Sequence, residues 1–250
     1  MHRFFVSPEQ VGRNTILIDD QEDLHHMRKV LRLKEGDEVG ISDSVEWEYR
    51  ARLLSLDQET AQLKILDKQA FAAEPSVEVT LFQGIPKQGK METIVQKCVE
   101  LGIHEIVPVF MDRTVVVDKG NFGRKIDRWN KVSAEAVKQC KRGIIPRVAD
   151  PIRMKALLAS GRSDLFGGFD LVLFPYENER GRTIKDVLTE CKDSPQRIAV
   201  FIGPEGGFSD EEAKAIVAGG GESVSLGKAV LRTETAGMAA LAMIMYELEL

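Results

Sequence analysis

The chain of 250 residues has few cysteines, few histidines and no long apolar run, and each scarcity excludes a class of protein. Its three cysteines, Cys98, Cys140 and Cys191, are odd in number and widely spaced, so they build neither a disulfide framework nor a paired zinc knuckle. The four histidines lack nearby acidic or cysteine ligands at metal-binding spacing. No apolar run approaches the roughly 18 residues that cross a bilayer. We therefore expect neither a metal centre nor a membrane span.

The overall composition is that of a soluble globular protein, with 43% hydrophobic and 29% charged residues. The N-terminal stretch MHRFFVSPEQ lacks the apolar core of a secretory signal, so we expect a cytoplasmic location.

The net charge of −5 conceals a basic middle segment. Residues 84–147 carry 13 basic and 7 acidic side chains, and HHMRKVLRLK (residues 25–34) adds four cations with no acid. Local excess positive charge of this kind is typical of surfaces that bind a polyanion such as RNA.

Residues 1–72 are predicted to form a small β-barrel domain. Short strand-like runs separated by polar turns cover residues 3–6, 15–18, 37–42, 47–56 and 60–66. One helix interrupts them, with Leu24, Met27, Val30 or Leu31, and Leu33 along its apolar stripe. Residues 67–76 have the small, proline-containing character of a linker, which places a domain boundary near residue 72.

Residues 73–250 are predicted to form an α/β domain. Apolar runs of strand length at 77–82, 105–110, 170–174, 197–203 and 223–227 alternate with helices that begin near residues 91, 121, 183, 209 and 233. These runs do not alternate in polarity, which indicates parallel strands covered by helices.

The helix at 121–142 is predicted to present a basic ridge to solvent opposite its buried stripe. The ridge repeats at helical spacing through Arg124, Arg128, Lys131, Lys138 and Arg142. A solvated face in which Glu135 pairs with Lys131 or Lys138 explains the same pattern without any ligand.

The C-terminal helix is apolar nearly all round between residues 236 and 246, which requires burial on more than one side. We predict a homodimer built partly on this helix, with burial inside a single chain as the alternative.

Three loops after predicted strands are candidates for a ligand site, at residues 173–181, 202–209 and 226–236, because open parallel sheets bind ligands beyond the carboxyl ends of their strands. FIGPEGGFSDEE (residues 201–212) lacks both the P-loop and the dinucleotide spacing. Ser209 and Glu212 form a capping box, and Asp210 and Glu211 occupy the positive end of the helix dipole. A ligand without phosphates therefore fits this loop, and a simple tight connection is the alternative.

LGKAVLRTETA (residues 226–236) places Arg232 and Glu234 beside a nearly all-apolar helix. Charges so close to a core are either paired with each other or functional.

FIGPEGGFSDEE followed by LGKAVLRTETA resembles the paired C-terminal motifs of the SPOUT superfamily of RNA methyltransferases, and within it the 16S ribosomal RNA uracil-N3 methyltransferase family. Residues 25–39, 89–109 and 128–146 support the same resemblance. The family has a PUA-like N-terminal barrel, a C-terminal α/β domain with a deep trefoil knot, and a homodimeric assembly. The resemblance implies S-adenosylmethionine as cofactor and 16S rRNA, or the small ribosomal subunit, as partner, with N3 of one uridine as the methylated atom.

The resemblance also implies which residues hold the cofactor. They lie in the three loops and are Leu173, Phe174, Pro175, Ile202, Gly203, Glu205, Gly207, Leu226, Val230, Leu231, Arg232 and Thr235.

For the chemistry, Glu205 is expected as the base that takes the N3 proton, and Arg232 as the group that stabilises the resulting charge or orients Glu234. The expected phosphate contacts are the first domain's Arg28, Lys29 and Arg32 together with the basic ridge. Two alternatives remain open: a non-catalytic RNA-binding assembly factor on the same scaffold, and a SPOUT enzyme that methylates transfer RNA or a ribose hydroxyl.

Overall fold

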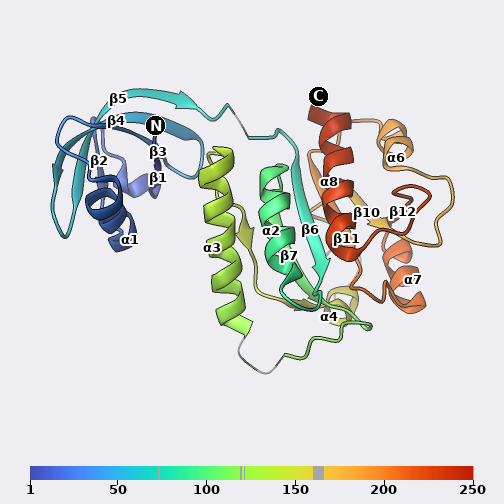
Figure 1. Ribbon diagram of the computed structural model, residues 1–250. Helices are drawn as coiled ribbons and strands as arrows, with labels where there is room; N and C mark the ends of the chain where they lie inside the picture. Colours follow the sequence, from blue (N-terminus) through green and yellow to red (C-terminus); the bar gives the residue numbers. More distant parts are fainter. Residues whose placement is uncertain (73, 119, 121, 160–165, 250) are drawn as a thin grey trace. The chain divides into compact units, whose positions relative to one another are not determined.

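A computed structural model describes residues 1–72, 74–118, 120, 122–159 and 166–249 (Figure 1). The chain forms two compact units. The first comprises residues 1–74 and 137–145, and the second comprises residues 75–136 and 146–250.

The first unit is built on a curled five-stranded sheet in the order β1-β3-β4-β5-β2 (Figure 1). Its strands are β1 (Arg3–Phe5), β2 (Thr15–Ile18), β3 (Glu38–Ser42), β4 (Trp47–Leu56) and β5 (Ala61–Ala70), and a 3-10 turn, η1 (Pro8–Gln10), precedes β2. Alternate residues of the long strands are buried, which gives the sheet one apolar face. These are the strands that the sequence predicted. β5 continues to Ala70, so the first part of the expected linker is strand instead.

The helical insertion of this unit consists of α1 (Gln21–His25) and the π-helical turn η2 (His26–Leu31). Leu24 and Met27 are buried in the sheet's core, and Leu31 packs against that core. Val30 is exposed, so Leu31, and not Val30, is the residue of the predicted apolar stripe at this turn. Arg32 ends the turn in the left-handed conformation.

Arg142 corrects the predicted basic ridge. It lies beyond the end of α3 (Phe122–Cys140) and is buried in the first unit, with 7% of its side chain exposed. Its guanidinium donates to the Glu74 carboxylate at 2.7 Å, and the backbone N–H groups of Gly143 and Ile144 donate to the same carboxylate. A buried charge needs such compensation. Arg142 therefore belongs to the core of this unit and to no solvent-facing ridge.

The second unit contains a parallel sheet in the order β12-β10-β11-β6-β7-β8, with β9 paired to β7. The strands are β6 (Glu78–Gly84), β7 (Glu105–Phe110), β8 (Arg147–Val148), β9 (Ile152–Arg153), β10 (Leu171–Pro175), β11 (Arg197–Ile202) and β12 (Glu222–Val224). The five predicted strands are all present, and β12 is shorter than expected. The two-residue strands β8 and β9 escaped prediction because segments so short carry no apolar pattern.

Helices cover both faces of this sheet. On one face α8 (Thr233–Glu249) packs against β6 and β11, between α2 (Lys90–Glu100) and α6 (Ile184–Glu190). On the other, α4 (Met154–Ala159) and α7 (Asp210–Ala218) meet a core of aromatic and aliphatic side chains that includes Phe82, Phe174 and Phe201. Because the strands are parallel, the loops after β6, β10, β11 and β12 gather at one edge.

Candidate functional site

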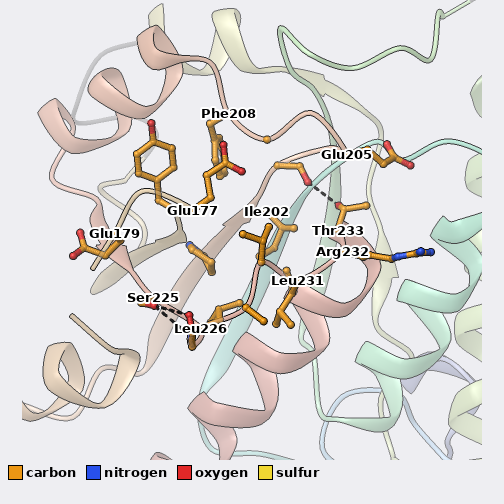
Figure 2. Close-up of a pocket in the computed structure, with 18 of the residues that line it drawn as sticks. Glu177, Glu179, Ile202, Glu205, Phe208, Ser225, Leu226, Leu231, Arg232 and Thr233 are labelled. Atoms are coloured by element: carbon orange, nitrogen blue, oxygen red, sulfur yellow. Dashed lines mark hydrogen bonds between the residues drawn. The ribbon is translucent and has the colours of Figure 1, made fainter. Parts of the chain in front are cut away.

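A pocket of about 490 Å³ lies at this edge of the second unit, lined by the loops that follow β10, β11 and β12 (Figure 2). These are the three loops singled out in the sequence. Much of the lining is backbone and small or apolar side chains, and charged side chains stand around it. Figure 2 shows Glu177 and Phe208 on one side of the pocket and Glu205 and Arg232 on the other.

Nine of the twelve expected cofactor residues line this pocket: Pro175, Ile202, Gly203, Glu205, Gly207, Leu226, Val230, Leu231 and Arg232. The other three do not. Leu173 and Phe174 are buried inside β10, where Phe174 packs with Phe208 in the hydrophobic core, and Thr235 is exposed in the first turn of α8. The resemblance implied all twelve residues, and a cofactor contact by Leu173, Phe174 and Thr235 stays a prediction.

Gly203 and Gly207, in the glycine loop between β11 and α7, do not readily accept a side chain. A Cβ on Gly203 would lie 3.0 Å from the Gly207 backbone, and Gly207 has a φ of +69°. The predicted capping box is confirmed: the Ser209 side chain accepts from the Glu212 N–H, and the Glu212 carboxylate accepts from the Ser209 N–H. The start of α7 is thus satisfied by its own side chains, which leaves no phosphate site there.

A chain of hydrogen bonds fastens this loop to the sheet and to α8. The Thr233 hydroxyl donates to the Gly203 carbonyl at 2.7 Å and accepts from the Gln83 amide at 2.9 Å. Gln83 also donates to the Gly84 carbonyl. Three elements far apart in sequence are therefore held together directly beneath the pocket.

An acid–lysine–acid cluster stands at the edge of the pocket. The Lys90 Nζ lies 3.3 Å from the Glu205 carboxylate and 3.1 Å from the Glu234 carboxylate. The backbone N–H of Lys87 also donates to Glu205 at 3.0 Å. The cluster joins the loop after β6, the glycine loop and α8. Sequence reasoning missed Lys90, although its place at the start of a helix after the glycine- and proline-containing loop GIPKQG marks a carboxyl-end position.

These contacts fix the charges of the cluster. Burial alone would raise the pKa of Glu205, but hydrogen bonds from backbone N–H groups and from Lys90 outweigh it and hold that pKa below its usual range. The pKa of Glu234 is lowered too, by a hydrogen bond from its own N–H and by Lys90. Hydrogen bonding to Glu234, and then to Glu205, raises the pKa of Lys90. At neutral pH the cluster therefore consists of two carboxylates around one ammonium.

Arg232, the other expected catalytic residue, has 82% of its side chain exposed. Its guanidinium lies 4.0 Å from Glu234, at the outer limit of an ion pair. It lines the pocket but points largely into solvent. The Arg232–Glu234 pair that the sequence left open is therefore present but long, and Lys90 is the closer partner of Glu234.

Two further carboxylates were not among the expected residues. Glu177 and Glu179 follow β10 in the loop YENERG and line the pocket. The Glu177 carboxylate faces Gly207, 3.5 Å from where a Cβ would stand on that residue. Glu179 accepts a 2.5 Å hydrogen bond from the Ser223 hydroxyl. The loop was singled out by its position, but nothing in its spacing distinguished these acids from ordinary surface residues.

The expected phosphate contacts are distributed over both units. In the first unit, Lys29 and Arg32 are exposed and Arg28 is half-buried. Along α3, Arg124, Arg128, Lys131 and Lys138 are exposed. Arg128 forms an ion pair with Glu92 at 2.9 Å, and Lys138 forms one with Asp23, outside its own helix, at 3.7 Å.

Over the described part of the chain, no group of three or more His, Cys, Asp or Glu side chains is arranged to hold a metal ion. None of the helices in that part has the length and apolar character needed to traverse a bilayer.

The fold and this site define an RNA-modifying class of protein. The model of the RNA methyltransferase domain matches residues 73–245, and the model of the RNA methyltransferase PUA domain matches residues 18–66. The chain belongs to this RNA methyltransferase family.

Two relatives carry the name ribosomal RNA small subunit methyltransferase E. The protein of Bacillus subtilis (strain 168) is 30% identical, with 100% of this chain and 98% of the relative covered. The protein of Synechocystis sp. (strain ATCC 27184 / PCC 6803 / Kazusa) is 33% identical, with 97% and 77% covered.

Solved structures agree with these relatives. The ribosomal RNA small subunit methyltransferase E of Neisseria gonorrhoeae, bound to S-adenosyl methionine, superposes with a TM-score of 0.83 at 27% identity, covering 99% of this chain and 98% of that one. A Legionella pneumophila protein in complex with the same cofactor gives a TM-score of 0.81 at 27% identity, covering 98% and 97%.

Proposed function

We propose that this protein transfers a methyl group from S-adenosylmethionine to N3 of one uridine in the 16S rRNA of the small ribosomal subunit. The observation that carries the proposal is the pocket, in which all three family loops converge and nine of the expected cofactor residues lie together. Relatives named for this subunit's RNA and structures solved with this cofactor support it.

The pocket suits the cofactor's chemistry. Its volume of about 490 Å³ is that of an ordinary small-molecule site. The close-packed glycine backbone around Gly203 and Gly207 offers amides and carbonyls to an adenine, and Leu226 and Leu231 offer apolar surface. Glu177 and Glu179 provide negative charge for the cofactor's cationic groups. When bound, S-adenosylmethionine supplies a methyl group activated by its sulfonium.

The protein's own residues must prepare the uracil nitrogen. N3 carries a proton at neutral pH and becomes nucleophilic only as that proton leaves. We propose Glu205 as the acceptor, since its carboxylate is ionised and stands at the pocket. Its lowered pKa makes it a weak base, so the reaction also requires a positive charge that stabilises the uracil anion.

The RNA must bring a single base to this pocket. N3 lies on the Watson–Crick edge, so the uridine has to be unpaired or flipped out of a helix. Basic residues of the first unit and of α3 are the proposed phosphate contacts, namely Arg28, Lys29, Arg32, Arg124, Arg128, Lys131 and Lys138. A ribosomal substrate implies work in the cytoplasm.

Two features of the family are proposed for this chain as well. We propose a homodimer that covers the exposed apolar side chains of α8, among them Met243 and Tyr246. We also propose the trefoil knot. Hydrogen bonds of the segment after β12 support it: the Ser225 N–H donates to the loop after β10, and the Thr233 hydroxyl donates to the loop after β11.

The test combines binding and product identity. Calorimetry with S-adenosylmethionine should show one site per chain. Incubation of the protein and cofactor with small subunits lacking the modification, followed by nucleoside mass spectrometry, should yield N3-methyluridine. Cofactor binding without methyl transfer would favour the non-catalytic assembly factor, and a 2′-O-methylated nucleoside would favour the other type of SPOUT enzyme.

A further inference from the structure

Lys90 differs from the other cations of the pocket. Among the residues that line the pocket, Arg180, Lys228 and Arg232 are exposed. The Lys90 side chain, by contrast, has only 27% of its surface exposed to solvent. Among the described lining cations, Lys90 is thus the one with two carboxylates within 3.3 Å of its charged group.

The placement of Lys90 is unfavourable for its own helix. It is the first residue of α2, where the positive end of the helix dipole disfavours a cation. The preceding residues, Gln88 and Gly89, both have positive φ, so the backbone turns sharply to bring Lys90 to the pocket. Partly exposed ion pairs contribute little to stability, so stability alone gives little reason for a lysine here.

Its two partners come from different elements. Glu205 belongs to the glycine loop and Glu234 to α8, and each holds the ammonium within 3.3 Å. Only one carboxylate is needed to neutralise one lysine. Glu234 therefore still holds the ammonium in place when the charge on Glu205 changes.

We propose that Lys90 is a catalytic residue whose ammonium contacts a carbonyl oxygen of the target uracil and stabilises the negative charge that forms as N3 loses its proton. This inference rests on the proposed N3 methylation. N3 lies between two carbonyl groups, and the charge of its anion spreads onto both oxygens. A positioned cation at one of these oxygens stabilises the anion more strongly than the neutral base.

The proton step is balanced within the cluster. The N3–H bond breaks, its electron pair stays on N3, and an O–H bond forms on the Glu205 carboxylate. Lys90 gives up no proton. As Glu205 becomes neutral, the ammonium remains paired with Glu234 and with the uracil anion. Lys90 therefore takes the charge-stabilising role that was expected of Arg232, whose side chain is 82% exposed.

The test uses Lys90→Met, Lys90→Arg and the control Lys97→Met. Lys97 is on the same helix and forms a surface ion pair with Glu100, three positions along the chain. Single-turnover rates are measured on small-subunit rRNA containing either uridine or 5-fluorouridine, whose fluorine makes N3–H more acidic. Calorimetry for the cofactor and filter binding for the RNA accompany the rates.

Lys90→Met should lower the single-turnover rate on uridine RNA about 100-fold. The affinities for the cofactor and for the RNA should stay within about twofold of the wild-type values. On 5-fluorouridine RNA the loss of rate should be about tenfold smaller than on uridine RNA. Lys90→Arg should recover part of the rate, and Lys97→Met should match the wild type.

Two results would overturn the assignment: a Lys90→Met rate near the wild-type rate, or an equal fold loss on both RNAs, as a purely structural role would give. Absence of N3-methyluridine from the wild-type reaction would instead overturn the proposed function.

Discussion

Thr233 shows how one hydroxyl can support a whole site. It is buried, accepts from Gln83 and donates to the carbonyl of Gly203, so it joins α8 to the strand below and to the loop that lines the pocket. It belongs to the LRTETA motif, but the sequence suggested only that it begins a helix. The structure shows that its larger role is to fix the glycine loop.

Replacing Thr233 by valine should destabilise the protein and weaken cofactor binding. Valine keeps the shape but removes the hydrogen-bond partner of the Gly203 carbonyl and of one N–H of the Gln83 amide, at a cost of about 2 kcal/mol in the free energy of unfolding. Urea unfolding and calorimetry with S-adenosylmethionine measure the two effects. Thr189→Val, at an exposed position of α6, is the control and should change neither. Unaltered cofactor affinity in Thr233→Val would contradict this role.

Asp43 makes the stability of the first unit depend on pH. Burial pushes its pKa up, but the backbone N–H groups of Trp47, Glu46 and Val45 donate to its carboxylate and hold the pKa below its usual value. A lowered carboxyl pKa stabilises the fold at pH values above the unfolded pKa of about 3.9, and that stability is lost as the pH falls through the lower folded value.

Asp43→Ala should therefore lower the free energy of unfolding by about 2 kcal/mol at pH 7. The difference from the wild type should stay constant down to about pH 5 and shrink below about pH 4. Unfolding monitored by circular dichroism at several pH values measures it, beside Glu35→Gln at an exposed position. A difference that persists unchanged into strong acid would contradict the assignment.

At the scale of elements, the loops at the carboxyl ends of the parallel strands contact one another so closely that the last residues of the strands help to shape the pocket. A Cβ on Gly84, the last residue of β6, would lie 2.5 Å from the backbone nitrogen of Pro204 in the glycine loop. Two loops that the sequence treats separately therefore have to be considered as one packed layer.

Gly84→Ala should displace the glycine loop and weaken S-adenosylmethionine binding by more than about tenfold, or about 1.4 kcal/mol. Gly123→Ala is the matched control, because nothing lies within 4 Å of its added methyl group, and it should bind the cofactor normally. Calorimetry measures the affinity of both variants for S-adenosylmethionine. Equal affinities would show that the loop has more freedom than its contacts indicate.

Sequence patterns predicted the main elements because each carries its own local signal. The apolar runs of β6, β7, β10 and β11 and the capping residues Thr183 and Ser209 depend only on neighbouring residues. Lys90 and Glu74 carry no such signal. Lys90 meets carboxylates more than 100 positions away along the chain, and Glu74 meets Arg142 across 68 positions. Arg142 fitted the ridge by spacing, yet α3 ends at Cys140, before the periodicity reaches it.

At the scale of the whole molecule, α8 carries apolar side chains that the described residues leave exposed. Thr233, Gly237, Ala240, Leu241 and Ile244 are buried by the rest of the unit, while Met243 and Tyr246 are exposed. The sequence predicted burial on more than one side, and β6, β11, α2 and α6 pack around the helix while Met243 and Tyr246 stay exposed. A second copy of the chain is the proposed cover.

Met243→Glu combined with Tyr246→Glu should convert the proposed dimer into a monomer, because carboxylates would then be buried in the interface without partners. Sedimentation velocity measures the mass directly. Lys214→Glu, at an exposed position of α7, should sediment as the wild type does. A wild-type protein that sediments as a monomer would contradict the dimer proposal itself.

The most direct measurement of the central claim is nucleoside mass spectrometry of 16S rRNA from cells that lack this gene. The proposed function predicts that N3-methyluridine disappears from one position and returns when the gene is restored. Full retention of N3-methyluridine, or loss of a different methylated nucleoside, would contradict it.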